Sequence, residues 1–128
     1  MYKKFIFILV VALFTIPLQA QNNTTRFFFS YGYEAVTVAD SAIGFTAAKI
    51  TPPNVSYRAA MVSVRVECAA STPCDSRFTM DGTTVTTLVG TLLSDGDSFV
   101  IYGYENILAF RAIRTGADSA SYRVNFYR

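Results

Sequence analysis

Alternation of apolar and polar side chains with a period of two residues is the pattern that most constrains this fold. It is clearest in residues 60–68, where three valines alternate with polar residues, in the order Val62, Ser63, Val64, Arg65, Val66 and Glu67. Successive side chains of a strand point to opposite faces. The segment therefore predicts a strand with one face in a core and the other in water, which is typical of antiparallel sheets.

Several shorter apolar segments follow, separated by residues that favour turns. Asp81-Gly82 and Asp95-Gly96 are typical of hairpin turns, and Pro52-Pro53-Asn54 marks a loop. The expected strands, besides residues 60–68, span residues 36–38, 42–46, 76–80, 85–88, 98–102, 107–113 and 121–127. Seven or eight short strands without a sustained helical period predict an all-β fold. We expect one antiparallel β-sandwich, Ig-like or jelly-roll-like, over residues 36–128.

The first twenty residues have the layout of a secretory signal peptide. Lys3 and Lys4 precede an apolar run that ends at Phe14, and a short segment then leads to Ala20. Cleavage after Ala20 would leave Gln21 first. Because the apolar run is about half of the ~20 residues that a transmembrane helix needs, we expect no integral membrane span. We therefore expect a secreted or cell-surface protein, which would pass through the periplasm if its source is a bacterium. An uncleaved membrane anchor is the alternative. This leader is the only helix that we expect.

Charge argues against nucleic acid as a partner. Loss of Lys3 and Lys4 with the leader brings the 11 basic residues down to the number of acidic ones, which is 9. The remaining arginines are scattered along the sequence. A neutral chain without a basic stripe lacks the electrostatic pattern of nucleic-acid binding.

Cys68 and Cys74 are the only two cysteines. In an exported chain, an even pair at this spacing favours a disulfide over a metal site. We expect the bridge at the mouth of a hairpin formed by residues 62–68 and 76–80. In a reducing compartment both would be ordinary semi-buried thiols.

Acidic residues near the second turn could supply oxygen ligands for calcium. Asp95 and Asp97 flank Gly96, and Glu105 could lie at the same end of the sandwich. Calcium requires six to eight oxygens, however, so turn formation is the preferred interpretation and we expect no metal or other cofactor. The sequence contains no histidine, which removes the usual Ser-His and Cys-His catalytic systems. We expect no enzymatic activity.

Aromatic residues are the main candidates for interaction. Residues 21–35 form an N-terminal arm or first strand, in which four alternate rings would share one face: Phe27, Phe29, Tyr31 and Tyr33. The segment is either a core strand or an arm donated to a neighbouring subunit. Further rings near strand ends could be exposed for subunit contacts or for sugars, or could belong to an aromatic core: Tyr102, Tyr104, Tyr122 and Tyr127.

Residues 77–86 have the sequence Arg-Phe-Thr-Met-Asp-Gly-Thr-Thr-Val-Thr, and four further short motifs follow at residues 90–93, 96–99, 107–114 and 124–128. Together with residues 36–38 and 43–46, these motifs resemble those of a group of small bacteriophage and prophage β-sandwich proteins. The Asp-Gly-Thr strand is also similar to the C-terminal Ig-like domain of chitobiase-type hexosaminidases, although Val85 stands where those domains usually have proline. Both resemblances imply a non-catalytic sandwich, and neither assigns binding residues.

These observations predict a non-enzymatic structural subunit of a filament, cell surface or virion, which self-associates through its sandwich as a homo-oligomer or with an assembly partner. Low net charge and β-branched strand edges favour association. A carbohydrate-binding or accessory recognition module is the alternative, and it predicts a row of exposed tyrosines.

Overall fold

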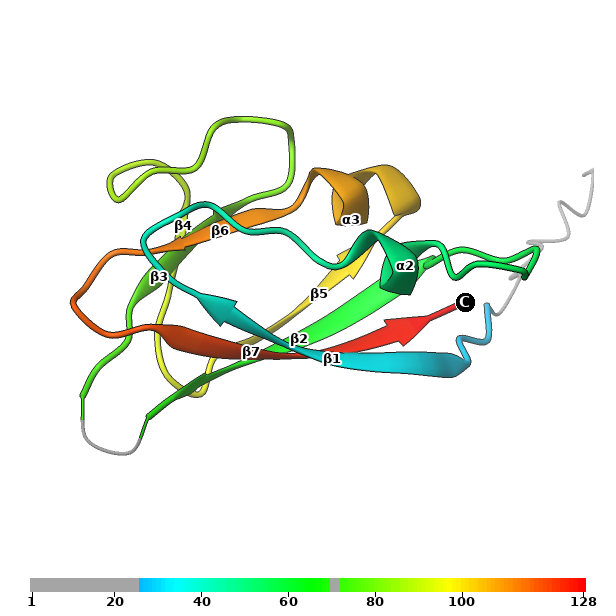
Figure 1. The fold of residues 1–128 in the computed structure, drawn as a ribbon, viewed down its shortest axis with the longest axis horizontal. Helices are drawn as coiled ribbons and strands as arrows, with labels where there is room; N and C mark the ends of the chain where they lie inside the picture. The colour runs from blue at the N-terminus through cyan, green and yellow to red at the C-terminus, as the bar shows by residue number, and fades with distance from the viewer. Residues whose placement is uncertain (1–25, 70–71) are drawn as a thin grey trace, which may run out of the picture.

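Two antiparallel sheets pack face to face in the computed structural model, which describes residues 26–69 and 72–128 (Figure 1). The larger sheet has the strand order β1 (Ser30–Val38), β7 (Ala120–Tyr127), β2 (Met61–Cys68) and β5 (Ser98–Tyr102). The smaller sheet has the order β4 (Thr91–Leu93), β3 (Ser76–Thr79) and β6 (Arg111–Arg114). The predicted all-β sandwich is confirmed.

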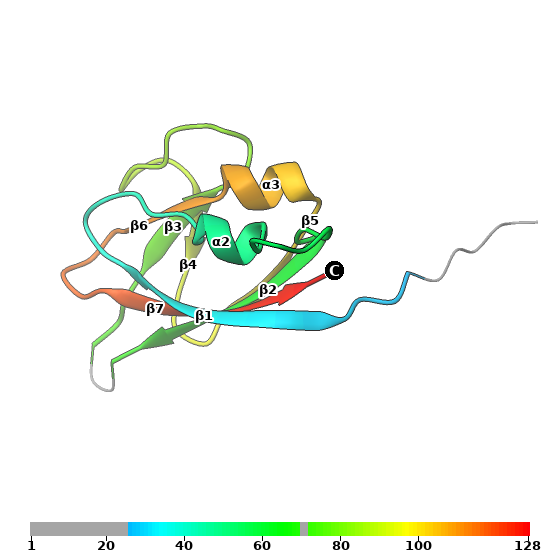
Figure 2. The same ribbon diagram turned by 45° about the vertical axis from the view of Figure 1, so that its right-hand side comes forward.

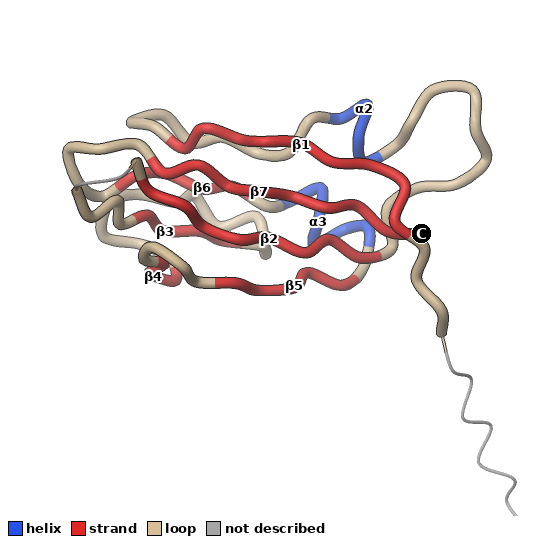
Figure 3. The backbone as a smooth tube through the Cα atoms, turned by 90° about the horizontal axis from the view of Figure 1, so that it is seen from below, coloured by secondary structure: helices blue, strands red, loops and turns tan. Residues whose placement is uncertain are grey.

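The alternating pattern of residues 60–68 forms β2, an inner strand of the larger sheet, between β7 and β5. Its three valines are buried, as predicted, and they face the smaller sheet. The neighbouring strand β7 repeats the pattern with four buried residues, which are Ala120, Tyr122, Val124 and Phe126. Figure 3 shows the four strands of this sheet side by side. The alternate residues of these strands form its outer face.

Aromatic rings fill the space between the sheets. Phe45 stacks on Phe110 with ring centroids 4.3 Å apart, and Phe78 stacks on Phe99 at 4.7 Å. Tyr122 packs against Phe110 from the larger sheet. Each buried ring is worth about 1.5–3 kcal/mol of transfer free energy, so this aromatic layer is a principal source of stability.

Residues 39–60, which include one short helix, close one side of the sandwich together with a second short helix. Ile43 forms an isolated bridge with Ala112 of β6, and the chain then enters α2 (Ala47–Ile50). The second helix, α3 (Tyr104–Ala109), follows β5 directly. Figure 2 shows the two helices close together on the same side, where Ile50 and Ile107 are buried.

The expectation that only the leader is helical is therefore wrong. Gly103 ends β5 with φ +87°, and residues 107–109, which we expected in a strand, belong to α3. A short apolar run such as Ile-Leu-Ala-Phe suits a strand or a buried helix equally by periodicity, and the fold decides between them.

Three other expected strands differ from the structure. Residues 42–46 form no strand, and only Ile43 makes an isolated bridge there. Residues 85–88 form no strand; Val85 reaches the core from an irregular loop. The first strand runs from Ser30 to Val38, so the strand expected at residues 36–38 and the strand considered for residues 21–35 form one continuous element. The predicted signal peptide and residues 21–25 of the arm lie outside the described residues. In the part of the chain that is described, no helix is long and apolar enough to cross a membrane.

Candidate functional site

The N-terminal aromatic residues lie at an edge of the larger sheet. Phe29 and Arg128 exchange two backbone hydrogen bonds of 3.1 Å, which extend the pairing of β1 with β7 of the same chain. The Phe27 and Phe29 side chains are nevertheless 76% and 65% exposed. Single exposed apolar side chains are common on protein surfaces, but two large rings close together beside a sheet edge are a candidate for contact with a partner.

A β-bulge separates the two tyrosines of β1. The register shifts between Ser30 and Gly32, which leaves Tyr31 as the extra residue. Tyr31 consequently packs against the core, and its hydroxyl donates to the Lys49 carbonyl at 2.8 Å. Burial, with a smaller contribution from Tyr57, raises the pKa of Tyr31 to about 12. Tyr33 is 50% exposed on the outer face, so the prediction that the four rings share one face is wrong.

Tyr102 and Tyr104 differ in exposure, as Tyr33 and Tyr31 do. Tyr102 is 59% exposed and lies near Phe28, with ring centroids 6.1 Å apart. Tyr104 opens α3, where the Arg58 guanidinium covers its ring at 4.3 Å from the centroid. Of this pair, Tyr102 is the one available to a partner.

The outer face of the larger sheet carries polar side chains between the exposed tyrosines. Arg123 of β7 donates from Nε to Glu67 at 2.7 Å and from Nη1 to the hydroxyl of Tyr33 at 3.2 Å. These two hydrogen bonds, that to Glu67 first, raise the pKa of the Arg123 guanidinium. A hollow of about 300 Å³ adjoins Arg123, with Ser63 and Arg65 of β2 in its lining.

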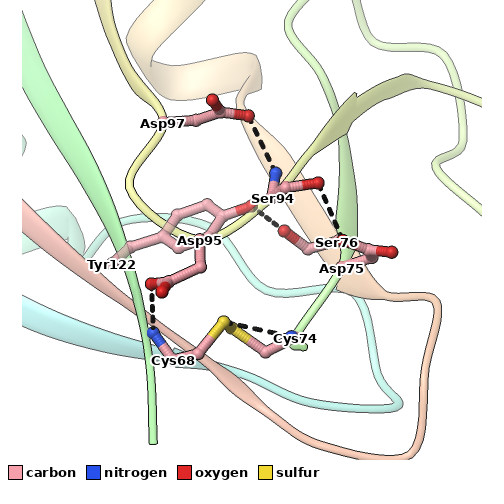
Figure 4. The surroundings of a disulfide bond; sticks show 8 residues. All are labelled: Cys68, Cys74, Asp75, Ser76, Ser94, Asp95, Asp97 and Tyr122. Carbon is pink, nitrogen blue, oxygen red and sulfur yellow. Dashed lines mark hydrogen bonds between the residues drawn. A yellow bond between two sulfur atoms is a disulfide. The ribbon is translucent and has the colours of Figure 1, made fainter. Parts of the chain in front are cut away.

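Cys68 and Cys74 form the predicted disulfide, with Cα atoms 5.4 Å apart (Figure 4). We expected the bridge at the mouth of a hairpin, and this part of the prediction is wrong, because β2 and β3 belong to different sheets. It lies where the chain crosses from the larger sheet to the smaller one, and it ties the end of β2 to the start of β3. Its place indicates a structural role.

The candidate calcium ligands do not come together. Asp95 accepts a hydrogen bond from the backbone N–H of Cys68 at 2.9 Å, and Asp97 accepts one from Ser94 at 2.8 Å. Glu105 lies in α3, beyond the opposite end of β5, so the expectation of a shared end is wrong. Within residues 26–69 and 72–128, no group of three or more His, Cys, Asp or Glu side chains could hold a metal ion.

The pairing of Arg65 with Arg123 on the outer face is a feature that sequence reasoning missed. Both arginines alternate with buried residues in their strands, which places each on a solvated face. Their direct opposition depends on the register of β2 with β7, which are far apart in the sequence. The alternation could have identified the face but not the pair.

The chain matches no protein-family model, no curated protein and no solved structure. The resemblance to phage-type sandwiches and to chitobiase-type domains therefore stays a prediction.

Proposed function

We propose that this protein is a non-enzymatic structural subunit of a secreted or surface-displayed assembly, and that its copies associate through the free edge of β1. The observation that carries this proposal is the combination of a nine-residue edge strand with two exposed phenylalanines, Phe27 and Phe29, directly before it. Sequence features agree with an exported role, because the leader has the layout of a signal peptide and the remaining chain is neutral.

The free edge of β1 is suited to pairing with a second copy. Within the described part of the chain, the only backbone partner of this strand is β7, on its other side. Edge strands usually carry lysine, proline or short length as protection against pairing. β1 contains neither lysine nor proline, and Glu34 is its only charged residue. The bulge at Tyr31 is the one protective irregularity, and it leaves residues 33–38 regular.

Antiparallel pairing of β1 with its own copy about a two-fold axis would need no second surface. Such an interface is self-complementary, which is the commonest arrangement in homo-oligomers. It would extend two four-stranded sheets into one continuous sheet and would bring Phe27 and Phe29 toward the partner. Burial of each ring favours association by about 1.5–3 kcal/mol.

Light scattering coupled to size-exclusion chromatography tests the proposal. Thr37→Lys puts a charge on an exposed position in the regular part of β1, opposite the uncharged Ser121 of β7, and should shift the oligomer to monomer, because a charged side chain on an edge strand opposes its pairing with a second copy. Thr91→Lys, in the edge strand β4 of the other sheet, is the matched control and should leave the oligomer intact. A wild-type protein that stays monomeric at high concentration, or equal effects of the two lysines, would contradict association through β1.

A second function, glycan recognition, is favoured by the outer face itself. Tyr33 and Tyr102 lie at the two edge strands of the same sheet and both expose about half of their surface. Tyrosine rings on a sheet surface stack on sugars while their hydroxyls stay hydrated. Association through the edge of β1 would leave this face open, so the two functions are compatible. Binding of immobilised glycans by the wild type and not by Tyr33→Ala tests this second proposal.

A further inference from the structure

We propose that the outer face around Arg65 binds an acidic saccharide, through one carboxylate of the sugar. This inference rests on glycan recognition, the second function proposed above, and names its ligand class. It does not depend on association through β1, because the site lies on the face of the sheet and not on its edge.

The central observation is a pair of like charges. Arg65 of β2 and Arg123 of β7 are direct partners in the antiparallel register. Like charges in this position are destabilising. Glu67 compensates Arg123 through the 2.7 Å hydrogen bond. No hydrogen bond or ion pair to the Arg65 side chain occurs within residues 26–69 and 72–128, so one positive charge is left without a partner there.

Polar groups that suit sugar hydroxyls surround this charge. The hollow of about 300 Å³ has Arg65 and Arg123 in its lining, together with Ser98 of β5 and Asn125 of β7. Among the described residues, neither the Ser98 hydroxyl nor the Asn125 amide makes a side-chain hydrogen bond. Both are therefore free to bind hydroxyl groups, as in sites where a few placed polar groups orient a ligand.

An aromatic ring borders the same site. Tyr33 is the register partner of Asn125, and its hydroxyl accepts the hydrogen bond from Arg123. The ring thus lies on the outer face beside the hollow, half exposed, and it can stack on the apolar face of a sugar. Val100, which is exposed on the other side of the hollow, adds a second apolar contact.

The balance of charge selects the kind of anion. With Glu67 included, the three charged side chains leave a single net positive charge, which suits one carboxylate. A guanidinium can bind a carboxylate through two parallel hydrogen bonds, and Arg65 has its donors available. A nucleic acid needs a row of basic residues to displace its counterions, and this face has none.

Titration of the ¹⁵N-labelled protein by nuclear magnetic resonance tests the inference. The probes are a trisaccharide of galacturonic acid, the corresponding neutral trisaccharide of galactose, and acetate as a free carboxylate. We expect the acidic trisaccharide to shift amide signals of β2, β5 and β7, and to bind at least about tenfold more tightly than either control. Arg65→Gln should weaken its binding by about tenfold, to the level of the neutral sugar.

Lys49→Gln is the matched control, because it removes the same charge from an exposed side chain of α2 and leaves the outer face unchanged. It should bind like the wild type. Equal binding of acidic and neutral trisaccharides would overturn the inference while glycan recognition stands. Absence of binding by both sugars would overturn glycan recognition as well. If acetate binds as tightly as the acidic trisaccharide, the site recognises a carboxylate without the sugar, and the inference of a saccharide site is overturned.

Discussion

The hydroxyl groups of Ser76 and Tyr122 lie 2.6 Å apart near the disulfide, where their hydrogen bond joins the two sheets. Ser76 belongs to β3 of the smaller sheet and Tyr122 to β7 of the larger one, and both are fully buried. In the described part of the chain, no buried side-chain oxygen or nitrogen lacks a partner. The pair therefore links the two sheets through a satisfied buried hydrogen bond.

Tyr122→Phe should destabilise the fold by about 1–3 kcal/mol, because the Ser76 hydroxyl would stay buried without its partner. Ser76→Ala should cost a similar amount. The double variant should lose less than the sum of the two, since it leaves neither hydroxyl orphaned. Urea denaturation of the four proteins measures this cycle, and strictly additive losses would contradict the importance of the bond.

Alkaline pH should destabilise the protein through the same tyrosine. Burial raises the pKa of Tyr122 to about 12, from the ordinary value of 10.0, against the opposing effect of the hydrogen bond with Ser76. Between these pH values the unfolded chain loses the phenolic proton while the folded chain keeps it. Through Tyr122 alone, the free energy of unfolding should therefore be unchanged below pH 10 and should fall by about 3 kcal/mol up to pH 12. Tyr31, whose pKa is raised to about 12 as well, adds to the decline in the same direction.

Denaturation at several pH values from about 8 to 12 tests this sign and its origin. Tyr122→Phe should show a shallower decline, and Tyr102→Phe, which changes an exposed ring, should follow the wild type. Equal slopes in all three proteins would mean that another group causes the alkaline transition.

The disulfide should contribute about 2 kcal/mol to stability, because it closes a short loop between the two sheets. Replacement of both Cys68 and Cys74 by alanine should lower the free energy of unfolding by that amount and remove any effect of reductant. Intact mass should show the native protein two hydrogens lighter than its reduced form. Free thiols in protein purified natively from the producing organism would contradict both the bridge and the predicted export.

Local patterns in the sequence predict the local structure well. The valines of β2 occupy the buried face, and strands occur close to the expected residues 76–80, 98–102 and 121–127. In each case the residues that alternate also pack against the opposite sheet. The pattern and the packing agree because a half-buried strand leaves the same period in the sequence.

Long-range features could not be predicted in this way. Asp95-Gly96 forms a turn, as expected, but it connects β4 of one sheet with β5 of the other and does not form a hairpin. Turn residues fix the local direction of the chain, whereas sheet membership depends on distant partners. The buried position of Tyr122, which we considered for an exposed ring, and the opposition of Arg65 to Arg123 depend on distant partners for the same reason.

Substitution of three glycines by alanine should separate steric clash from backbone strain. Gly90 has φ +120°, and a Cβ there would lie 2.7 Å from the carbonyl oxygen of Phe78. Gly96 has φ +84° with open space around it, and Gly116 has open space and no positive φ. Alanine should therefore meet both steric clash and backbone strain at Gly90, backbone strain alone at Gly96, and neither at Gly116.

Gly90→Ala should lose more than about 2 kcal/mol, since β3 or the loop before β4 must move to relieve the clash, in addition to the strain at positive φ. Gly96→Ala should lose about 1–2 kcal/mol from strain alone. Gly116→Ala should be neutral or stabilising by about 0.4–1 kcal/mol, because it restricts the unfolded chain. Thermal denaturation should then rank the variants in the order Gly116, Gly96 and Gly90, from most to least stable, with about 4–8 °C for each kcal/mol. Equal melting temperatures for Gly90→Ala and Gly96→Ala would show that the chain before β4 relaxes freely, against the close packing of Gly90 on β3.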